Sequence, residues 1–256
     1  IPGLVGSEMC IRDSIYIVFF TYNTIYMAIK KIIAIASAKG GVGKSSLTAA
    51  IASSMSKKLK VGILDADIYG PNQHLLFNLN TTKPKLITKD GKKFFEPVKA
   101  NLLSLNSMGF ILDDDKAAIW RGPMLSGAIR QLMDSTDWGD LDYLFIDMPP
   151  GTGDAYLTVA KEIKPDYSIL IATGNKLAIH DVHKSIAAFE KLNIKILGFI
   201  ENNTSNHDSS IGFESLTDLK IKHIGSVPFD TNIFNFNEDN LPNSILDITS
   251  KIQSLV

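Results

Sequence analysis

The sequence has almost no cysteine, since Cys10 is the only one in 256 residues. A framework of intrachain disulfides is therefore excluded, and the composition fits a reducing, cytoplasmic compartment. An excess of charge is also missing, because 26 lysines and arginines oppose 27 aspartates and glutamates. A net charge of −1 gives no reason to expect nucleic acid or an anionic membrane as a partner.

Long hydrophobic runs are absent as well. No apolar stretch reaches the roughly 18 residues that a membrane-spanning helix needs. Hydrophobic residues still make up 45% of the chain. That share provides a sizeable core for one large α/β domain or two small ones.

Residues 1–26 are expected to lie outside the fold. Within them, residues 7–14 resemble a translated sequencing-adapter sequence, and residues 15–26 are apolar but too short to span a bilayer. The alternatives are an unusual native extension or a signal peptide, although no small-residue cleavage site follows. Met27 resembles a natural start directly ahead of the first predicted strand, so residues 27–256 are expected to form a single domain.

The most informative stretch is glycine-rich and covers residues 37–45, SAKGGVGKS. It follows the apolar run 32–36, which predicts a buried parallel strand, and precedes residues 46–55, where apolar side chains recur at helical spacing. Strand, glycine-rich turn and helix is the context that a phosphate-binding loop requires. Glycine tolerates positive φ and close approach, so successive N–H groups and the helix N-terminus can hold phosphate oxygens.

This loop predicts a site for ATP and Mg²⁺. Lys44 would reach the β- and γ-phosphates, and the hydroxyl of Ser45 would bind the metal. The loop differs from the common form by Ala38 and by an extra lysine, Lys39. That lysine resembles the deviant loop of the MinD, ParA and nitrogenase iron-protein class, which implies a dimer in which Lys39 crosses to the partner's nucleotide. The residues expected to contact the nucleotide are Gly40, Gly41, Val42, Gly43, Lys44, Ser45 and Ser46.

Acidic residues follow two further apolar runs that predict buried strands. Asp65 and Asp67 come after residues 61–64, and Asp147 ends the run 141–147. Ligands bind at the carboxyl ends of strands in parallel sheets, so these carboxylates are expected beside the phosphates. A helix cap is the alternative for a single acid. By resemblance to the same class, Asp67 would position the attacking water, Asp65 would support Mg²⁺ and Asp147 would hold it through water.

Three blocks make the resemblance specific: residues 63–71 (ILDADIYGP), 120–124 (WRGPM) and 142–154 (DYLFIDMPPGTGD). Together they resemble the Mrp family of P-loop ATPases. That resemblance implies a cytosolic homodimer that carries iron–sulfur clusters to apoproteins. It also implies that Asn202 reads the amino edge of adenine, which suits an amide that can donate and accept, and that Pro228 lies near the base.

The chain departs from the family at the cluster. Members that carry clusters have a Cys-x-x-Cys motif shortly after the Glu-Asn pair, whereas residues 203–213 of this chain contain no cysteine. Thiolates hold iron–sulfur clusters, so a cluster at this place is doubtful. His207 and Asp208 could hold a metal only with further ligands. His180 and His183 are expected to be surface or packed residues, because no third ligand is evident.

The remaining segments indicate the fold. Lysines crowd residues 83–93 around an Asp-Gly turn, which predicts a surface hairpin that is either a basic contact patch or an edge protected by lysines. Residues 243–256 carry regularly spaced isoleucines and one lysine, which favours a packing helix over a membrane-surface helix. Alternating strands and helices predict a doubly wound α/β domain with a mainly parallel sheet, a P-loop NTPase of the MinD/ParA type.

Three functions fit these patterns. The first is an Mrp-type ATPase in iron–sulfur cluster assembly or transfer, with apoproteins as clients. The second is an ATP-dependent dimeric switch of the MinD or ParA type without cluster binding. The third is a family member that has lost cluster binding and kept the ATPase.

Overall fold

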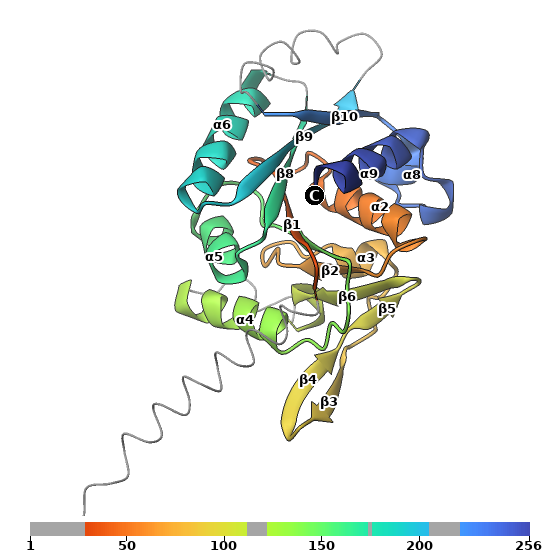
Figure 1. Cartoon of the computed structure of the whole chain (residues 1–256), viewed down its shortest axis with the longest axis vertical. Helices are drawn as coiled ribbons and strands as arrows, with labels where there is room; N and C mark the ends of the chain where they lie inside the picture. The colour runs from red at the N-terminus through yellow and green to blue at the C-terminus, as the bar shows by residue number, and fades with distance from the viewer. Residues whose placement is uncertain (1–28, 112–121, 174–175, 205–220) are drawn as a thin grey trace, which may run out of the picture.

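Strands and helices alternate along the chain as a parallel sheet requires (Figure 1). The structure is a computed structural model that describes residues 29–111, 122–173, 176–204 and 221–256, so the predicted leader 1–26 lies outside it. The strands are β1 (Ile32–Ala36), β2 (Val61–Asp65), β3 (Lys85–Lys89), β4 (Lys92–Glu96), β5 (Val98–Ala100), β6 (Leu103–Ser107), β7 (Tyr143–Asp147), β8 (Tyr167–Thr173), β9 (Lys195–Thr204) and β10 (His223–Pro228). The helices are α2 (Lys44–Ser56), α3 (Gln73–Leu76), α4 (Gly122–Asp134), α5 (Asp154–Ile163), α6 (Lys176–Lys191), α8 (Thr231–Phe234) and α9 (Asn243–Leu255), with the short turns η1 (Met108–Phe110) and η3 (Glu238–Asn240).

Eight of the strands form one sheet in the order β10-β9-β8-β1-β7-β2-β6-β5. Every neighbouring pair is parallel except β5 and β6. The chain adds strands first on one side of β1 and later on the other. β1 therefore lies where a doubly wound sheet changes direction, the place at which such sheets bind ligands beyond the carboxyl ends of their strands.

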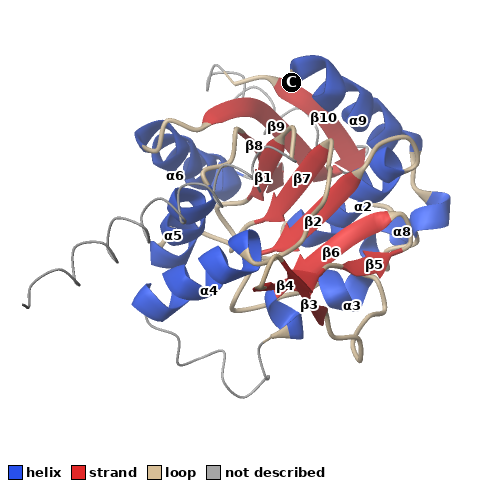
Figure 2. Cartoon of the chain, turned by 60° about the horizontal axis from the view of Figure 1, so that its bottom comes forward, coloured by secondary structure: helices blue, strands red, loops and turns tan. Residues whose placement is uncertain are grey.

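Helices cover both faces of this sheet (Figure 2). One core contains apolar side chains of α2 and α9, and the other contains those of α4, α5 and α6. Burying each large aliphatic side chain stabilises the fold by roughly 1.5–3 kcal/mol. The doubly wound, mainly parallel fold predicted from the sequence is confirmed, and the C-terminal helix packs as expected through Ile245, Ile248 and Ile252, all buried.

β3 and β4 form a separate two-stranded sheet that projects from the body of the molecule (Figure 1). The predicted turn connects them, with positive φ at Asp90 and Gly91. Phe95 ties the hairpin to the body, because its N–H donates to the carbonyl oxygen of Ser135 at 2.6 Å and its own carbonyl oxygen accepts from Asp137 at 2.9 Å. The hairpin is confirmed, and both interpretations of its lysines stay open.

The sheet register brings the predicted acids together. Asp65 on β2 is directly opposite Asp147 on β7, and Asp147 is also opposite Ile35 on β1. The carboxyl ends of the three central strands are therefore level, with the glycine-rich loop leaving β1 at the same height. Within the described ranges, no helix is long and apolar enough to cross a membrane.

Candidate nucleotide-binding site

The glycine-rich loop connects β1 to α2 and contains the positive φ values that its glycines allow. Gly41 and Gly43 have φ values of 78° and 84°, a region that glycine occupies readily. Gly43 directly precedes α2, so the first amides of this helix lack carbonyl partners within it. A helix start of this kind favours anionic oxygens.

A cavity of about 410 Å³ lies against the loop. A second cavity of about 370 Å³ continues from Ser45 and Ser46 to Phe234 on α8. Together they provide room for a ligand larger than phosphate. The first cavity is lined by Ser37, Gly40, Gly41, Gly43, Lys44, Ser45, Ser46, Asp67, Tyr69, Gly70, Asn72 and Pro150.

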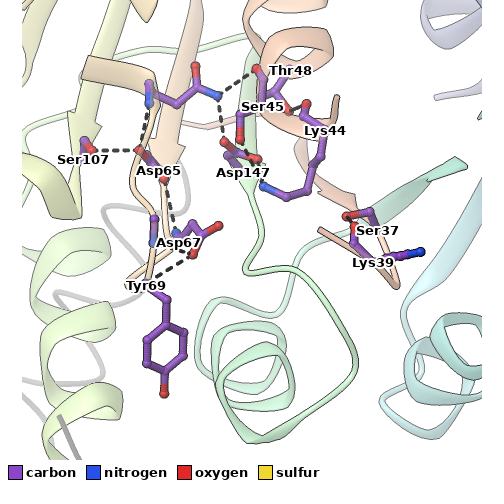
Figure 3. Close-up of polar contacts among 12 residues, drawn as sticks. Ser37, Lys39, Lys44, Ser45, Thr48, Asp65, Asp67, Tyr69, Ser107 and Asp147 are labelled. Atoms are coloured by element: carbon purple, nitrogen blue, oxygen red, sulfur yellow. Dashed lines mark hydrogen bonds and ion pairs between the residues drawn. The ribbon is translucent and has the colours of Figure 1, made fainter. Parts of the chain in front are cut away.

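Lys44 is only 6% exposed, and its amine forms an ion pair with Asp147 (Figure 3). The same amine lies 3.3 Å from the Oγ atom of Ser45. A buried charge is stable only when it is paired, and Asp147 supplies that partner from the end of β7. The protein thus accommodates a positive charge between a hydroxyl and a carboxylate, the two groups predicted to bind Mg²⁺.

Asp65 is fully buried and held by three donors. Its Oδ2 atom accepts from the N–H of Gln73 at 3.0 Å and from the hydroxyl of Ser107 at 2.8 Å. Its Oδ1 atom accepts from the N–H of Asp67 at 3.2 Å. Burial raises the pKa of Asp65 to about 7, and the neighbouring Asp147 carboxylate adds to the rise. Two adjacent buried carboxylates of this kind are typical of a site that takes up a cation.

Asp67 lines the cavity, and its carboxylate is fixed by the turn that follows β2. Its Oδ1 atom accepts from the N–H groups of Tyr69 and Gly70, both at 3.2 Å. Burial raises the pKa of Asp67, and the nearby Lys44 amine opposes this rise. Because Oδ1 accepts both hydrogen bonds from the turn, the turn fixes the orientation of the Asp67 carboxylate without a hydrogen bond to Oδ2.

Asn202 contacts the loop itself. Its Nδ2 atom donates to the carbonyl oxygen of Val42 at 2.8 Å, and the residue is 3% exposed. Pro228 is exposed at the end of β10. Neither residue lines the first cavity. Their contact with adenine therefore stays a prediction.

Lys39 lies apart from the group formed by Lys44, Asp65 and Asp147 (Figure 3). Its side chain is exposed, while its carbonyl oxygen accepts from the hydroxyl of Ser37 at 2.9 Å. This placement leaves the amine available to a second molecule.

Several predicted residues cannot be placed. Trp120, Arg121, His207 and Asp208 lie outside the described residues, and so does the side chain of His180. Among the residues that are described, no group of three or more His, Cys, Asp and Glu side chains could hold a metal ion by itself.

Two contacts of the site were not predicted from the sequence. The side-chain amide of Gln73 donates to Asp147, and the hydroxyl of Ser107 donates to Asp65. Gln73 follows a turn and Ser107 ends β6, so neither carries a local motif. Only the packing of α3 against α2 and β6, and the pairing of β6 with β2, bring them to the acids.

Known proteins resemble this chain in sequence. The family model of the NUBPL iron-transfer P-loop NTPases, within the ParA group, matches residues 28–255. An iron-sulfur cluster carrier protein of Pseudomonas fragi is 40% identical over 237 residues, which cover 88% of this chain and 82% of that protein. The carrier protein of Escherichia coli K12 is 42% identical over 185 residues, and the match covers 72% of this chain and 49% of that protein.

Solved structures agree with these matches. A nucleotide-binding protein of Archaeoglobus fulgidus in complex with ADP has a TM-score of 0.70 at 33% identity, and the match covers 89% of this chain and 92% of that one. The cell division ATPase MinD of Pyrococcus furiosus shares the fold, with a TM-score of 0.68 at 17% identity and coverage of 89% and 100%. Since the family model covers almost the whole sequence, the chain belongs to the NUBPL iron-transfer P-loop NTPases, as its resemblance to the Mrp family indicated.

Proposed function

We propose that this protein binds ATP with Mg²⁺ at the loop between β1 and α2 and hydrolyses it to ADP and phosphate. The observation that carries the proposal is the position of Lys44. Its amine lies at the wall of a cavity bounded by the phosphate loop, next to Ser45 and paired with Asp147. The Archaeoglobus fulgidus relative in complex with ADP supports a nucleotide in this fold.

Each group has a distinct part in the proposed reaction. The amine of Lys44 breaks its ion pair with Asp147 and moves to the phosphates, and the loop N–H groups hold phosphate oxygens. Ser45, Asp65 and Asp147 would hold Mg²⁺, which neutralises phosphate charge when bound. Asp67 orients a water whose oxygen bonds to the γ-phosphorus while the bond from that phosphorus to the β–γ bridging oxygen breaks. ADP leaves with the electron pair, and the proton of the water passes to phosphate or solvent.

The proposed cellular role is iron–sulfur cluster assembly or transfer in the cytoplasm, with apoproteins as clients. The names of the relatives support it. The protein would act as a homodimer in which Lys39 reaches the nucleotide of the partner subunit. A cluster is cargo in this role, and its thiolate ligands would have to come mainly from a partner, because the chain contains only Cys10.

That shortage of cysteine favours a second candidate. The same ATPase could work as a dimeric switch of the MinD or ParA type, without any cluster. The two candidates share the nucleotide site and differ in the cargo. Iron binding, and not ATP hydrolysis, separates them.

The Lys44→Ala variant tests the shared site. Calorimetry in the presence of Mg²⁺ should show ATP affinity falling on the order of 100-fold or more, because the phosphates lose a buried cation that water cannot replace. Lys58→Ala, an exposed lysine beyond the end of α2, is the matched control and should bind ATP normally. Circular dichroism must show that both variants fold. Unchanged ATP affinity in folded Lys44→Ala would refute the site.

A further inference from the structure

Gln73, the first residue of α3, is fully buried beside the proposed metal ligands. Its Nε2 atom donates to two acceptors, the carbonyl oxygen of Ser45 at 3.0 Å and Oδ2 of Asp147 at 2.7 Å. Its backbone N–H donates to Asp65 at 3.0 Å. One residue therefore connects the start of α2 with the ends of β7 and β2. These are the three elements that carry the proposed ligands of Mg²⁺.

The orientation of this side-chain amide follows from its partners. Both neighbours of Nε2 are oxygen atoms that accept, so the nitrogen must face them and the carbonyl oxygen must face away. That Oε1 atom is buried, and in the part of the chain that the structure describes it has no hydrogen-bond partner. Buried carbonyl oxygens normally accept from the protein, from water or from a ligand, so Gln73 has an acceptor without its donor.

Carboxylates only accept hydrogen bonds, and this corner of the site contains those of Asp65 and Asp147. Gln73 lines neither cavity, so its amide nitrogen, and not its carbonyl oxygen, is the group that acts on the site. In the structure described here, the amine of Lys44 pairs with Oδ1 of Asp147, while Gln73 holds Oδ2. When Lys44 moves to the phosphates, Oδ1 is released and Gln73 keeps the carboxylate in place.

We propose that Gln73 is a positioning residue for the magnesium–nucleotide complex. Its amide nitrogen holds the Asp147 carboxylate and the start of α2 in the positions from which they would bind Mg²⁺. The inference rests on the proposed ATPase function and adds a residue that acts on the metal and not on the phosphates. If this role is correct, the affinity for Mg²⁺ depends on Gln73. The affinity for nucleotide in the absence of Mg²⁺ does not depend on it.

The test replaces the amide and measures metal binding directly. Gln73→Met keeps the length of the side chain and removes both polar atoms. Mg²⁺ is titrated into the full chain with a bound fluorescent ATP analogue, and the same analogue is titrated in EDTA. We expect the apparent Mg²⁺ affinity to fall on the order of 10-fold or more, as for other partners of metal ligands. Affinity in EDTA should stay unchanged. Gln131→Met, an exposed glutamine on α4, is the matched control.

A second variant covers the case in which Gln73→Met does not fold. Gln73→Asn keeps a polar amide but draws it back by one carbon, so it should weaken Mg²⁺ binding as well. Wild-type Mg²⁺ affinity in either folded variant overturns the role of Gln73 and leaves the ATPase proposal intact. An equal loss of nucleotide affinity with and without Mg²⁺ also overturns it, because a purely structural role would act that way. Wild-type protein that binds the analogue without any effect of Mg²⁺ would refute both proposals.

Discussion

Asp67 differs from the other two acids of the site in its exposure to the cavity. Asp65 and Asp147 are fully buried, whereas Asp67 is 5% exposed and lines the cavity beside the phosphate loop. The turn after β2 holds Asp67 through Oδ1 alone. A carboxylate fixed in this way can orient water in the cavity, which agrees with the catalytic part proposed for it.

Asp67→Asn should therefore trap ATP. The Oδ1 atom of asparagine can still accept from the turn, so the fold and ATP affinity should persist. Losing the charged oxygen that orients water should slow hydrolysis on the order of 10²-fold. Phosphate release and ATP affinity are measured on the same sample. If ATP affinity collapses instead, Asp67 belongs to the metal ligands, and Asp65 becomes the better candidate for orienting water.

For single residues of the site, a contact could be predicted only where a local sequence pattern marks the residues that make it. Lys44 and Ser45 belong to a local motif, and Asp65 and Asp147 end apolar runs, so strand ends alone placed them together. The partners of the acids could not be predicted in this way. Gln73 lies 74 residues from Asp147 in sequence and Ser107 lies 42 residues from Asp65, and only tertiary packing joins them.

The glycine-rich loop is the element whose shape is most constrained. Gly41 and Gly43 both have positive φ, but their surroundings differ. A Cβ atom on Gly43 would lie 2.2 Å from Nδ2 of Asn202, whereas one on Gly41 would meet nothing within 4 Å. An alanine at Gly41 would therefore test the cost of positive φ alone, whereas an alanine at Gly43 would add a steric conflict with Asn202.

Gly43→Ala and Gly41→Ala form a matched pair. Each pays for an unfavourable φ, roughly 1–3 kcal/mol of stability. Only Gly43→Ala must also displace Asn202 from the carbonyl oxygen of Val42, so it should lower the melting temperature more and weaken ATP binding. Thermal denaturation with and without ATP measures both effects. Equal melting temperatures for the two variants would contradict the contact between Asn202 and the loop.

Helices and strands could be predicted where their apolar residues recur at a regular spacing. The isoleucines of α9 and the apolar run 32–36, which forms β1, fall where the pattern placed them. Strand ends are harder to predict, because β9 runs from Lys195 to Thr204 and continues beyond its last apolar residue, Ile200. Polar residues continue this strand because pairing with β8 and β10 satisfies their backbone groups. Backbone pairing of this kind leaves no signature in hydrophobicity.

In the proposed homodimer, two whole molecules would contribute residues to one nucleotide site. Lys39 is exposed, and its side chain lies apart from Lys44 (Figure 3). A second molecule facing the loop could receive its amine. Completion of the site by a partner would make hydrolysis depend on dimerisation.

Lys39→Ala should leave ATP binding to the monomer largely intact and weaken dimerisation. Removing one cation from an interface that faces phosphates takes away a charge-assisted contact. Sedimentation velocity with a non-hydrolysable ATP analogue measures the fraction of dimer. Lys93→Ala on the projecting hairpin is the control for loss of one exposed lysine. A Lys39→Ala variant that dimerises like the wild type would remove this role.

Cluster binding is the property on which family membership and composition disagree. The relatives are named for carrying clusters, while this chain has one cysteine, outside the described residues. An iron–sulfur cluster usually takes four thiolates, and a dimer of this chain offers two at most. Oxygen and imidazole ligands are harder and hold such clusters weakly.

We therefore expect the chain alone to bind no stable cluster. After anaerobic reconstitution with iron and sulfide and removal of free iron, the protein should contain almost no iron and lack the charge-transfer absorbance of a cluster. Cys10→Ser is the control, because it removes the remaining thiol. About four irons per dimer in both proteins, together with that absorbance, would contradict the expectation and require ligands other than cysteine. A cluster present in the wild type and lost in Cys10→Ser would contradict it too, and would make Cys10 a ligand.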